Sequence, residues 1–290
     1  MRFLTFRKQG ILGLAVERNG AFFGATANEA LYPGSLADLI AKGGNSLVEA
    51  HALLSHGHAV DLAAIEYLPP LPAPPQILCL GLNYADHSLE FGFEPPAFPT
   101  LFARFASSLI GHGAPILRPR VSDALDFEGE MACIIGKRAR HVRREDALGY
   151  VAGYSDFNDG SIRDYQNKTQ QWTIGKNFDS TGAFGPVFVT ADALPPGGSG
   201  LKIETRLNGE TVQSSNTEQM IFNVAHTIEI ISAAITLEPG AVLVTGTPSG
   251  VGAARKPPLF MKPGDVVEVD IEGIGILRNP VQDEPGPRSV

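Results

Sequence analysis

The sequence predicts a mainly β protein of the α+β class. Short apolar segments rich in Val, Ile, Phe and Thr recur along the 290 residues between Gly, Pro, Asn and Asp, a pattern typical of strands separated by turns. Few segments repeat apolar residues at steps of three and four, the spacing of an amphipathic helix. A chain of this length can bury a sizeable core.

The first 25 residues predict a small antiparallel unit. The segments MRFLTF, ILGLAVER and AFFGA have strand character, and Gln9-Gly10 and Asn19-Gly20 separate them. Asn-Gly between two such segments is a strong signal of a tight hairpin turn. The stretch from about 35 to 57 then has helical spacing.

A proline-rich stretch divides the chain. YLPPLPAPPQ, residues 67–76, contains five prolines, which break regular structure. We therefore expect a small N-terminal β-rich domain over residues 1–70, a linker over 71–76 and a second domain over 77–290.

The second domain is predicted to consist mainly of strands. Its strand-like segments are ILCLGL (77–82), MACIIG (131–136), GPVFVT (185–190), KIETRLNG (202–209), AVLVTGTP (241–248) and VVEVDIEGIG (266–275). One helix is expected over Gln219–Thr236, where apolar residues recur at steps of three to four. The last residues, EPGPRSV, have the character of a loose tail.

The composition limits the partners and the compartment. A formal net charge of -8 disfavours nucleic acid and anionic membranes as partners, because both recruit basic surfaces. No apolar stretch approaches the roughly 20 residues of a membrane span, and the start lacks the apolar core of a signal peptide. Cys79 and Cys133 lie in apolar segments and are expected to be buried, reduced thiols. We expect a soluble cytoplasmic protein.

The most informative stretch is DFEGEMACIIGK, residues 126–137. Asp126, Glu128 and Glu130 alternate, so on an extended strand they share one face, about 7 Å apart, and their charges repel. The apolar segment Met131–Ile135 follows and is expected to be buried on both faces. A divalent cation would compensate the charges, because hard cations take oxygen ligands. An acidic strand end in open solvent agrees equally well with the spacing.

The stretch GLNYADHSLEFG (81–92) carries a candidate general base. Asn83 is expected to cap a short helix on which His87 and Glu90 share a face, so that the carboxylate orients the imidazole. An isolated pair of this kind is more often an incidental feature of a surface helix. Gly, Pro and Phe residues around it predict that segment 84–95 closes over a ligand as a lid, with a fixed, packed loop as the alternative.

Further candidates follow in GYSDFNDGSIRDYQNK (153–168). Ser161 is expected to cap a helix, which leaves Asp159 on a loop, free to point into a site or to form a turn. Lys176 has a loop-like setting downstream. The Gly-rich VTGTPSGVG (244–252) lacks the Lys of a P-loop and the Gly spacing of a dinucleotide fold, which argues against a nucleotide.

Together these stretches resemble the fumarylacetoacetate hydrolase superfamily, in its acylpyruvase and 2-hydroxyhepta-2,4-diene-1,7-dioate isomerase-like branch. The motifs lie in the family's order and spacing between about 77 and 282: NYADHSLE (83–90), PTLFARFASSLIGHGAPI (99–116), DFEGE leading into IIGK (126–137), GYSDFNDGSIRDYQ (153–166), GKNFD (175–179) and TGTPSGVG (245–252). The resemblance implies that this domain is a mixed β-sandwich roll of the fumarylacetoacetate hydrolase C-terminal type, usually in a homodimer.

The resemblance also implies the composition of the site. It implies Mg²⁺ or Mn²⁺ held by Glu128, Glu130 and Asp159, with Asp126 in support. It implies catalytic roles for His87, Glu90 and Lys176, and substrate-binding roles for Arg163, Gln166 and Thr247. Departures from the family's more frequent residues are expected at the pocket rim, where they leave specificity open: Arg104, Gly129 and Gly160.

The expected function is divalent-metal-dependent hydrolysis of a C–C bond in an acylpyruvate-type diketo acid through a metal-stabilised enolate. Water deprotonated by His87, with Glu90 behind it, would attack the distal carbonyl, and Lys176 or Gln166 would stabilise the oxyanion. The same enolate serves oxaloacetate decarboxylation and isomerisation of a 5-carboxymethyl-2-hydroxymuconate-type diacid, and both stay open. A non-catalytic, metal-stabilised binding protein is the alternative of another class, and the intact His87 and Glu90 pair disfavours it.

Overall fold

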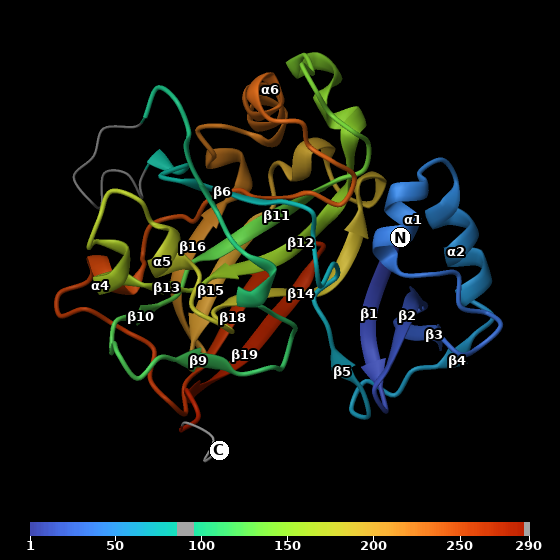
Figure 1. Cartoon of the computed structure of the whole chain (residues 1–290), viewed down its shortest axis with the longest axis horizontal. Coiled ribbons are helices and arrows are strands. Elements are labelled where there is room, and N and C mark those ends of the chain that lie inside the picture. Colours follow the sequence, from blue (N-terminus) through green and yellow to red (C-terminus); the bar gives the residue numbers. More distant parts are fainter. Residues whose placement is uncertain (86–95, 287–290) are drawn as a thin grey trace.

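The computed structural model describes residues 1–85 and 96–286, and it is mainly β as the sequence predicts (Figure 1). The strands of its larger sheet are β1 (Arg2–Lys8), β2 (Ile11–Arg18), β3 (Ala21–Thr26), β4 (His58–Ala59), β5 (Glu66–Tyr67), β6 (Ile77–Gly81), β7 (Thr100–Ala103), β8 (Leu109–Ile110), β11 (Gly129–Ile135), β12 (Val151–Asp159), β14 (Gly182–Thr190) and β17 (Val242–Val244). They lie in the order β4-β3-β2-β1-β14-β12-β11-β17-β6-β7, with β5 beside β1 and β8 beside β14.

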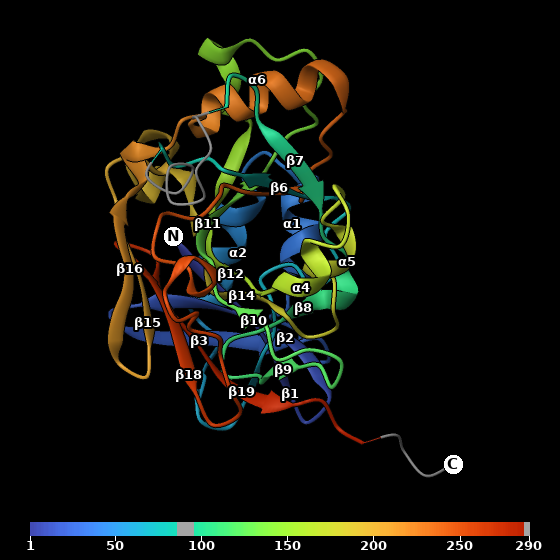
Figure 2. The same ribbon diagram turned by 90° about the vertical axis from the view of Figure 1, so that its left-hand side faces the viewer.

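A second sheet packs against the first (Figure 2). Its strands, in the order β16-β15-β18-β19-β9, are β9 (Ile116–Arg118), β15 (Lys202–Leu207), β16 (Glu210–Asn216), β18 (Val266–Ile271) and β19 (Gly275–Asp283). A short pair joins β10 (Leu125–Asp126) to β13 (Ser161–Ile162). The strand predicted over 266–275 is therefore a hairpin, because Gly273 turns the chain with a φ of 77°. The two packed sheets confirm the mixed sandwich that the resemblance implies.

The predicted N-terminal hairpins are confirmed. β1, β2 and β3 pair in antiparallel register. Gln9, Gly10, Asn19 and Gly20 all have positive φ, between 51° and 82°. Two consecutive residues with positive φ form the turn whose twist matches that of the flanking strands, which is why Asn-Gly marks a hairpin so clearly.

β1 joins the N-terminal strands to the rest of the sheet. It pairs antiparallel with β14, where Phe3 lies opposite Phe188, and the two buried rings are 6.2 Å apart between centroids. The first strands of the chain therefore continue the sheet that carries the later motifs. The division into 1–70, 71–76 and 77–290 stays a prediction about folding units.

The helices are short. They are α1 (Leu36–Lys42), α2 (Ser46–Leu54), α4 (Arg163–Gln166), α5 (Thr173–Lys176) and α6 (Val224–Ala234), with 3-10 turns η1 (Ala106–Ser108), η2 (Arg144–Tyr150), η3 (Ala191–Ala193), η4 (Pro196–Gly198), η5 (Thr217–Gln219) and η6 (Gly252–Ala254). The helical stretch 35–57 is split at Gly43 and Gly44, which both have positive φ. The helix predicted over Gln219–Thr236 begins later, because the side chain of Asn223 caps it by accepting from the N–H of His226 at 3.0 Å.

No helix formed by residues 1–85 or 96–286 is both long and apolar enough to cross a membrane. Cys79 and Cys133 are free thiols, and burial raises the pKa of each. This agrees with the prediction that both cysteines are buried and reduced, and it makes them poor nucleophiles.

The packed strands also hold a buried carboxyl group that the sequence analysis did not single out. Asp156 lies on β12 opposite Met131 of β11, and its exposed fraction is 0%. Neither of its oxygens has a hydrogen-bond partner in the part of the chain that the structure describes. Burial raises the pKa of Asp156 well above its usual value, Asp270 on β18 raises it further, and Arg2 on β1 lowers it. Folding therefore favours the protonated form of this group.

Replacing Asp156 by Asn should stabilise the protein at neutral and alkaline pH. An Asp whose pKa rises on folding costs stability as the pH rises above its unfolded value of 3.8, because the unfolded chain has lost a proton that the folded chain retains. The free energy of unfolding of the wild type should fall relative to D156N by about 1.4 kcal/mol per pH unit until the folded pKa is reached. Urea unfolding of both proteins with chelator, at several pH values between 5 and 8, measures this difference. Equal pH slopes would contradict it.

Candidate active site

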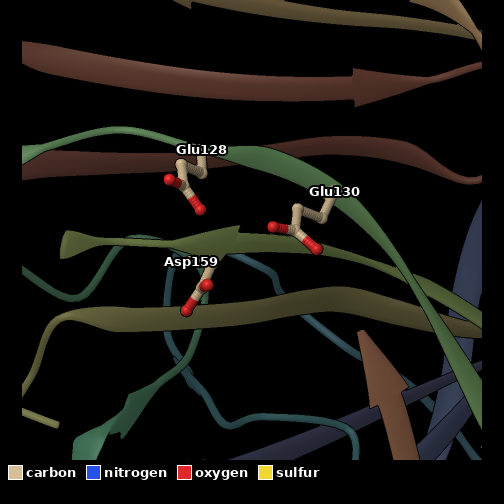
Figure 3. A group of neighbouring side chains, drawn as sticks. All are labelled: Glu128, Glu130 and Asp159. Atoms are coloured by element: carbon tan, nitrogen blue, oxygen red, sulfur yellow. The ribbon is translucent and has the colours of Figure 1, made fainter. Parts of the chain in front are cut away.

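Three carboxylates meet where β11 begins and β12 ends. Glu128 precedes β11, Glu130 lies on it, and Asp159 is the last residue of β12. The register pairs Gly129 with Asn158, and the N–H of Asp159 donates to the carbonyl of Glu128 at 2.9 Å. One oxygen from each of the three side chains lies within 4.8 Å of the other two, and all three residues are buried (Figure 3). The cluster is therefore built by pairing between two strands.

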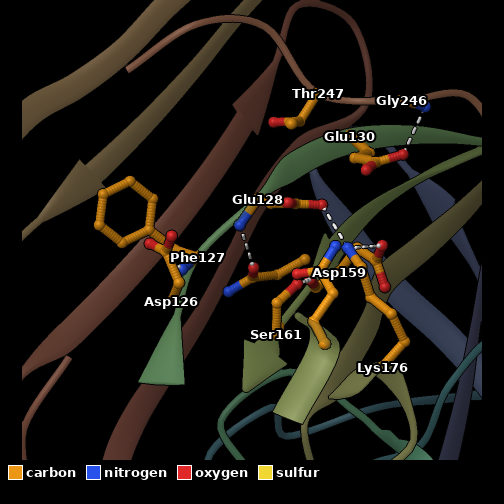
Figure 4. Close-up of polar contacts among 12 residues, drawn as sticks. Asp126, Phe127, Glu128, Glu130, Asp159, Ser161, Lys176, Gly246 and Thr247 are labelled. Atoms are coloured by element: carbon orange, nitrogen blue, oxygen red, sulfur yellow. Dashed lines mark hydrogen bonds and ion pairs between the residues drawn. The ribbon is translucent and has the colours of Figure 1, made fainter. Parts of the chain in front are cut away.

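Buried cations are paired with two of these carboxylates (Figure 4). The Nζ of Lys176 lies 2.7 Å from Oε2 of Glu128 and 2.6 Å from Oδ2 of Asp159. Nη1 of Arg163 lies 2.6 Å from Oε1 of Glu128, and the guanidinium of Arg104 pairs with Asp159. None of the five side chains is more than 8% exposed. Charges buried this deeply are tolerated because each has a close partner of opposite sign.

Glu130 is compensated less well than its two neighbours. No cationic group of the described residues forms an ion pair with it, and the backbone N–H of Gly246 donates to its carboxylate (Figure 4). Burial raises the pKa of Glu130 well above its usual value, the charges of Asp159 and Glu128 raise it further, and Lys176 lowers it. These contacts leave the cluster short of positive charge on the side of Glu130.

The cluster suits a divalent cation. Its donor atoms are carboxylate oxygens, the ligands that Mg²⁺ and Mn²⁺ prefer. The buried ionisable groups at this place, within the described ranges, are four carboxylates and three cations: Asp126, Glu128, Glu130, Asp159, Arg104, Arg163 and Lys176. When all are ionised they have one net negative charge, which a divalent cation would change to one net positive charge. Such a site attracts an organic acid even in a chain of net charge -8.

Asp126 contacts the cluster through Arg163, and its support of the metal ligands stays a prediction. It accepts from Nε of Arg163 at 2.7 Å, and from the N–H groups of Gly252 and Ala253 at 2.8 and 2.9 Å. It therefore fixes the guanidinium that also pairs with Glu128. A Cβ on Gly252 would lie 2.6 Å from Oδ1 of Asp126, so the close approach of this loop requires glycine.

A cavity of about 170 Å³ opens beside the cluster. Its polar lining contains the predicted residues Glu128, Glu130, Arg163, Gln166, Lys176 and Thr247. The rest of its lining was not predicted as part of the site: Leu80, Gly81, Leu82, Phe102, Asn167, Trp172 and Ala253. Most of these are apolar, and in the sequence nothing distinguishes them from ordinary core residues.

The hydroxyl of Thr247 is already engaged. It donates to the carbonyl of Gly129 at 2.9 Å and accepts from Nε2 of Gln213 at 2.8 Å. Because the hydroxyl has one proton, donation to a substrate oxygen would require the first bond to break. Gln166 accepts from Nη1 of Arg163 at 3.0 Å, so these two predicted substrate-binding residues on α4 are held together.

The local geometry differs from the expectation at three residues. Asp159 ends a strand and does not lie on a loop. Ser161 does not cap α4, because it lies on β13 opposite Asp126 and its hydroxyl donates to the carbonyl of Asp159 at 2.7 Å. Lys176 ends the short helix α5, whereas the sequence predicts a loop there. Its side chain is buried and forms ion pairs.

The three departures from the family pattern lie in the interior and not at the pocket rim. Besides its ion pair, Arg104 donates to the carbonyl of Gly160 at 3.1 Å and to the hydroxyl of Thr181 at 2.9 Å. A Lys could not reproduce this fork of donors. A Cβ on Gly129 would lie 2.1 Å from the hydroxyl of Thr205, and one on Gly160 would lie 2.2 Å from the carbonyl of Thr181. Both glycines therefore permit close packing.

The predicted pair of His87 and Glu90, and most of the predicted lid over 84–95, lie outside the described residues. Their roles stay predictions, as does the short helix. Asn83, just before them, is buried, and its amide donates to the carbonyl of Thr245 at 2.7 Å. The start of this stretch is therefore attached to the loop that follows β17.

Comparison with known proteins agrees with this geometry. Residues 76–282 match the family described as fumarylacetoacetate (FAA) hydrolase C-terminal. The chain belongs to this family. It is 40% identical over 273 residues to the oxaloacetate tautomerase fahd2, mitochondrial, of Xenopus laevis. The alignment covers 93% of this chain and 85% of the relative. It is 37% identical over 288 residues to the human oxaloacetate tautomerase FAHD2A, mitochondrial, and this alignment covers 97% of this chain and 91% of the relative.

Solved structures of this family are similar along almost the whole chain. A fumarylacetoacetate hydrolase from the psychrophilic Exiguobacterium antarcticum is 37% identical with a TM-score of 0.86, covering 98% of this chain and 100% of the other. A 5-carboxymethyl-2-hydroxymuconate delta-isomerase from Mycobacterium smegmatis is 29% identical with a TM-score of 0.77, with the same coverage. These relatives indicate a family enzyme that acts on small organic acids. The names of these two tautomerases contain the word mitochondrial, so a cytoplasmic location of this chain stays a prediction. The homodimer also stays a prediction.

Replacing Glu130 by Gln should have opposite effects on the stability of the metal-free protein and on its affinity for metal. The change removes a buried charge and keeps the shape of the side chain, so the metal-free protein should melt at a higher temperature than the wild type. Affinity for Mn²⁺ should fall by at least about tenfold, and saturating Mn²⁺ should therefore stabilise the variant less.

Titration calorimetry with Mn²⁺, and thermal unfolding with chelator or with Mn²⁺, measure the two effects. Glu210, which is exposed at the start of β16, provides the matched control, and E210Q should change neither property. Wild-type Mn²⁺ affinity in E130Q would contradict the assignment of Glu130 as a ligand.

Proposed function

We propose that this family enzyme is a divalent-metal-dependent tautomerase that interconverts the keto and enol forms of oxaloacetate or of a closely related 2-oxo dicarboxylate. The observation that carries the proposal is the buried carboxylate cluster with Lys176 and Arg163 beside it in one small cavity. The names of relatives with 37% to 41% identity support this reaction over the hydrolysis that was predicted first.

Glu128, Glu130 and Asp159 would hold the cation, which supplies a Lewis acid to polarise the 2-oxo group of the substrate. Arg163 lies at the cavity and presents a fixed guanidinium, a group suited to a substrate carboxylate. This explains how an acidic protein binds a dianion.

Lys176 acts as a cation in this scheme and not as a base. Burial alone lowers the pKa of Lys176, but the charges of Asp159 and Glu128 outweigh it, so the pKa is raised and these carboxylates favour the ammonium form. It can therefore donate a hydrogen bond to the oxygen on which negative charge develops.

The proton at C3 of the substrate needs a separate acceptor. Glu128 and Asp159 are engaged by cations, and Glu130 accepts from the N–H of Gly246. We therefore assign proton transfer to His87, oriented by Glu90, as the resemblance implies. When the proton leaves C3, the electron pair of that bond forms the C2=C3 double bond, and the former carbonyl oxygen takes a proton to give the enol.

Hydrolysis of an acylpyruvate is the second candidate. The spacing of His87 and Glu90 favours it, because the same base can activate water for attack on a distal carbonyl. Decarboxylation of oxaloacetate, in which the electrons of the broken C–C bond form the enolate of pyruvate, needs the same stabilisation of an enolate oxygen. So does isomerisation of a hydroxymuconate-type diacid, in which a C–H bond breaks to give a dienolate. The enzymatic relatives disfavour a non-catalytic binding protein.

Removal of the metal should abolish the tautomerase activity. The keto–enol conversion of oxaloacetate can be followed by ultraviolet absorbance of the enol, in the presence of exhaustive chelator and after addition of Mg²⁺ or Mn²⁺. We expect activity only with the metal, and full activity under chelation would refute the proposal. Parallel assays with acylpyruvates decide between the candidates, because a higher kcat/KM for acylpyruvate cleavage would favour the hydrolase.

Replacing His87 by Ala should lower kcat for tautomerisation by at least about 100-fold, the usual range for a general base. Binding of oxalate to the Mn²⁺-loaded variant should change little, because the residue is assigned to proton transfer. His58, whose side chain is 85% exposed, is the matched control, and H58A should retain wild-type kcat. A parallel loss of oxalate binding in H87A would show that His87 shapes the site.

A further inference from the structure

One wall of the cavity is apolar and takes no part in the proposed proton transfer. Phe102 on β7 has its ring centroid 4.9 Å from Nζ of Lys176 and 5.4 Å from the ring centroid of Trp172. The planes of the two rings are inclined by 64°. Phe102 therefore contacts both the ammonium of Lys176 and the indole of Trp172.

Trp172 is held in this position by the backbone on both sides. Its carbonyl accepts from the N–H of Lys176 at 3.1 Å, so the two side chains lie one helical turn apart and both line the cavity. On the other side, a Cβ on Gly81 would lie 2.3 Å from the indole ring. The absence of a side chain at Gly81 is what lets the ring lie against the end of β6.

We propose that Trp172 limits the length of the substrate, so that the cavity takes short-chain 2-oxo acids such as oxaloacetate and excludes long or aromatic acyl groups. The inference rests on the proposed function for the position of the acid group, which belongs at the carboxylate cluster and Arg163. Apart from the predicted site residues and Asn167, the lining is glycine or apolar, and a longer or aromatic acyl group would have to lie against it: Leu80, Gly81, Leu82, Phe102, Trp172 and Ala253.

The size of the cavity agrees with this limit. Its volume of about 170 Å³ is below the roughly 300–1,000 Å³ of pockets that take drug-sized ligands. Trp172 is the largest side chain of the apolar lining, and its removal would enlarge the cavity beside Phe102. Trp172 is thus a specificity-determining residue, whereas the carboxylate cluster sets the reaction.

A graded series of oxamates tests the limit without any turnover. Oxamates present adjacent carboxylate and carbonyl oxygens like those of a 2-oxo acid, and their N-alkyl group takes the place of the substrate tail. We expect calorimetry on the Mn²⁺-loaded wild type to show that affinity falls by about tenfold or more from N-methyl to N-hexyl oxamate. W172A should bind N-hexyl oxamate at least about tenfold more tightly than the wild type, with N-methyl oxamate affinity within about twofold.

The matched control is I174A, because Ile174 lies on α5, two residues after Trp172, and is 65% exposed. It should keep the wild-type dependence on chain length, and W172F should lie between the wild type and W172A. If W172A does not fold, W172F decides. The proposal would be overturned if W172A changed the affinity for short and long oxamates equally, or changed neither. It would also be overturned if the wild type bound oxamates of all lengths with equal affinity, or bound no oxamate. A length limit without any oxaloacetate tautomerase activity would refute the proposed function alone.

Discussion

The burial of several carboxylates in one place is the constraint on which the rest of this structure depends. Carboxylates in the interior cost several kcal/mol each unless positive charge is close. The chain supplies that charge from distant segments, with Arg104 after β7, Arg163 on α4 and Lys176 on α5. The loop after β17 adds the N–H of Gly246. Segments far apart in the sequence are thus held at the ends of β11 and β12 by the same charges.

The central strands make this arrangement rigid. β11 is buried along its whole length between β12 and β17. Because side chains alternate between faces, a slip of one residue would move Glu130 to the opposite face and bring Met131 to the cluster. The same strand pair also carries Asp156, whose buried carboxyl group has no cation at hydrogen-bonding distance within the described residues. One pair of strands therefore holds buried carboxyl groups whose charges are compensated to very different degrees.

In the proposed scheme, different parts of the cavity set the reaction and the specificity. The carboxylate cluster and its cations create a place where a divalent ion and an organic acid compensate one another, which suits enolate chemistry in general. The apolar wall formed by Phe102 and Trp172 meets this machinery at Lys176, through the ring of Phe102 and the backbone carbonyl of Trp172. In this scheme the apolar wall could change without a change in the charge of the cluster.

The sequence by itself determined the elements that depend on near neighbours. Asn19-Gly20 predicted a hairpin turn, and the apolar segment Met131–Ile135 predicted a buried strand. The order of the motifs predicted the family and, through it, the carboxylate cluster. Only the tertiary structure decided which side chains surround that cluster. Ser161 has the pattern of a helix cap, yet β13 pairs it with Asp126 and its hydroxyl donates to the carbonyl of Asp159. Trp172 has no local signal at all. Local patterns report interactions over a few residues, whereas charge compensation and cavity shape depend on contacts between segments that only the folded chain brings together.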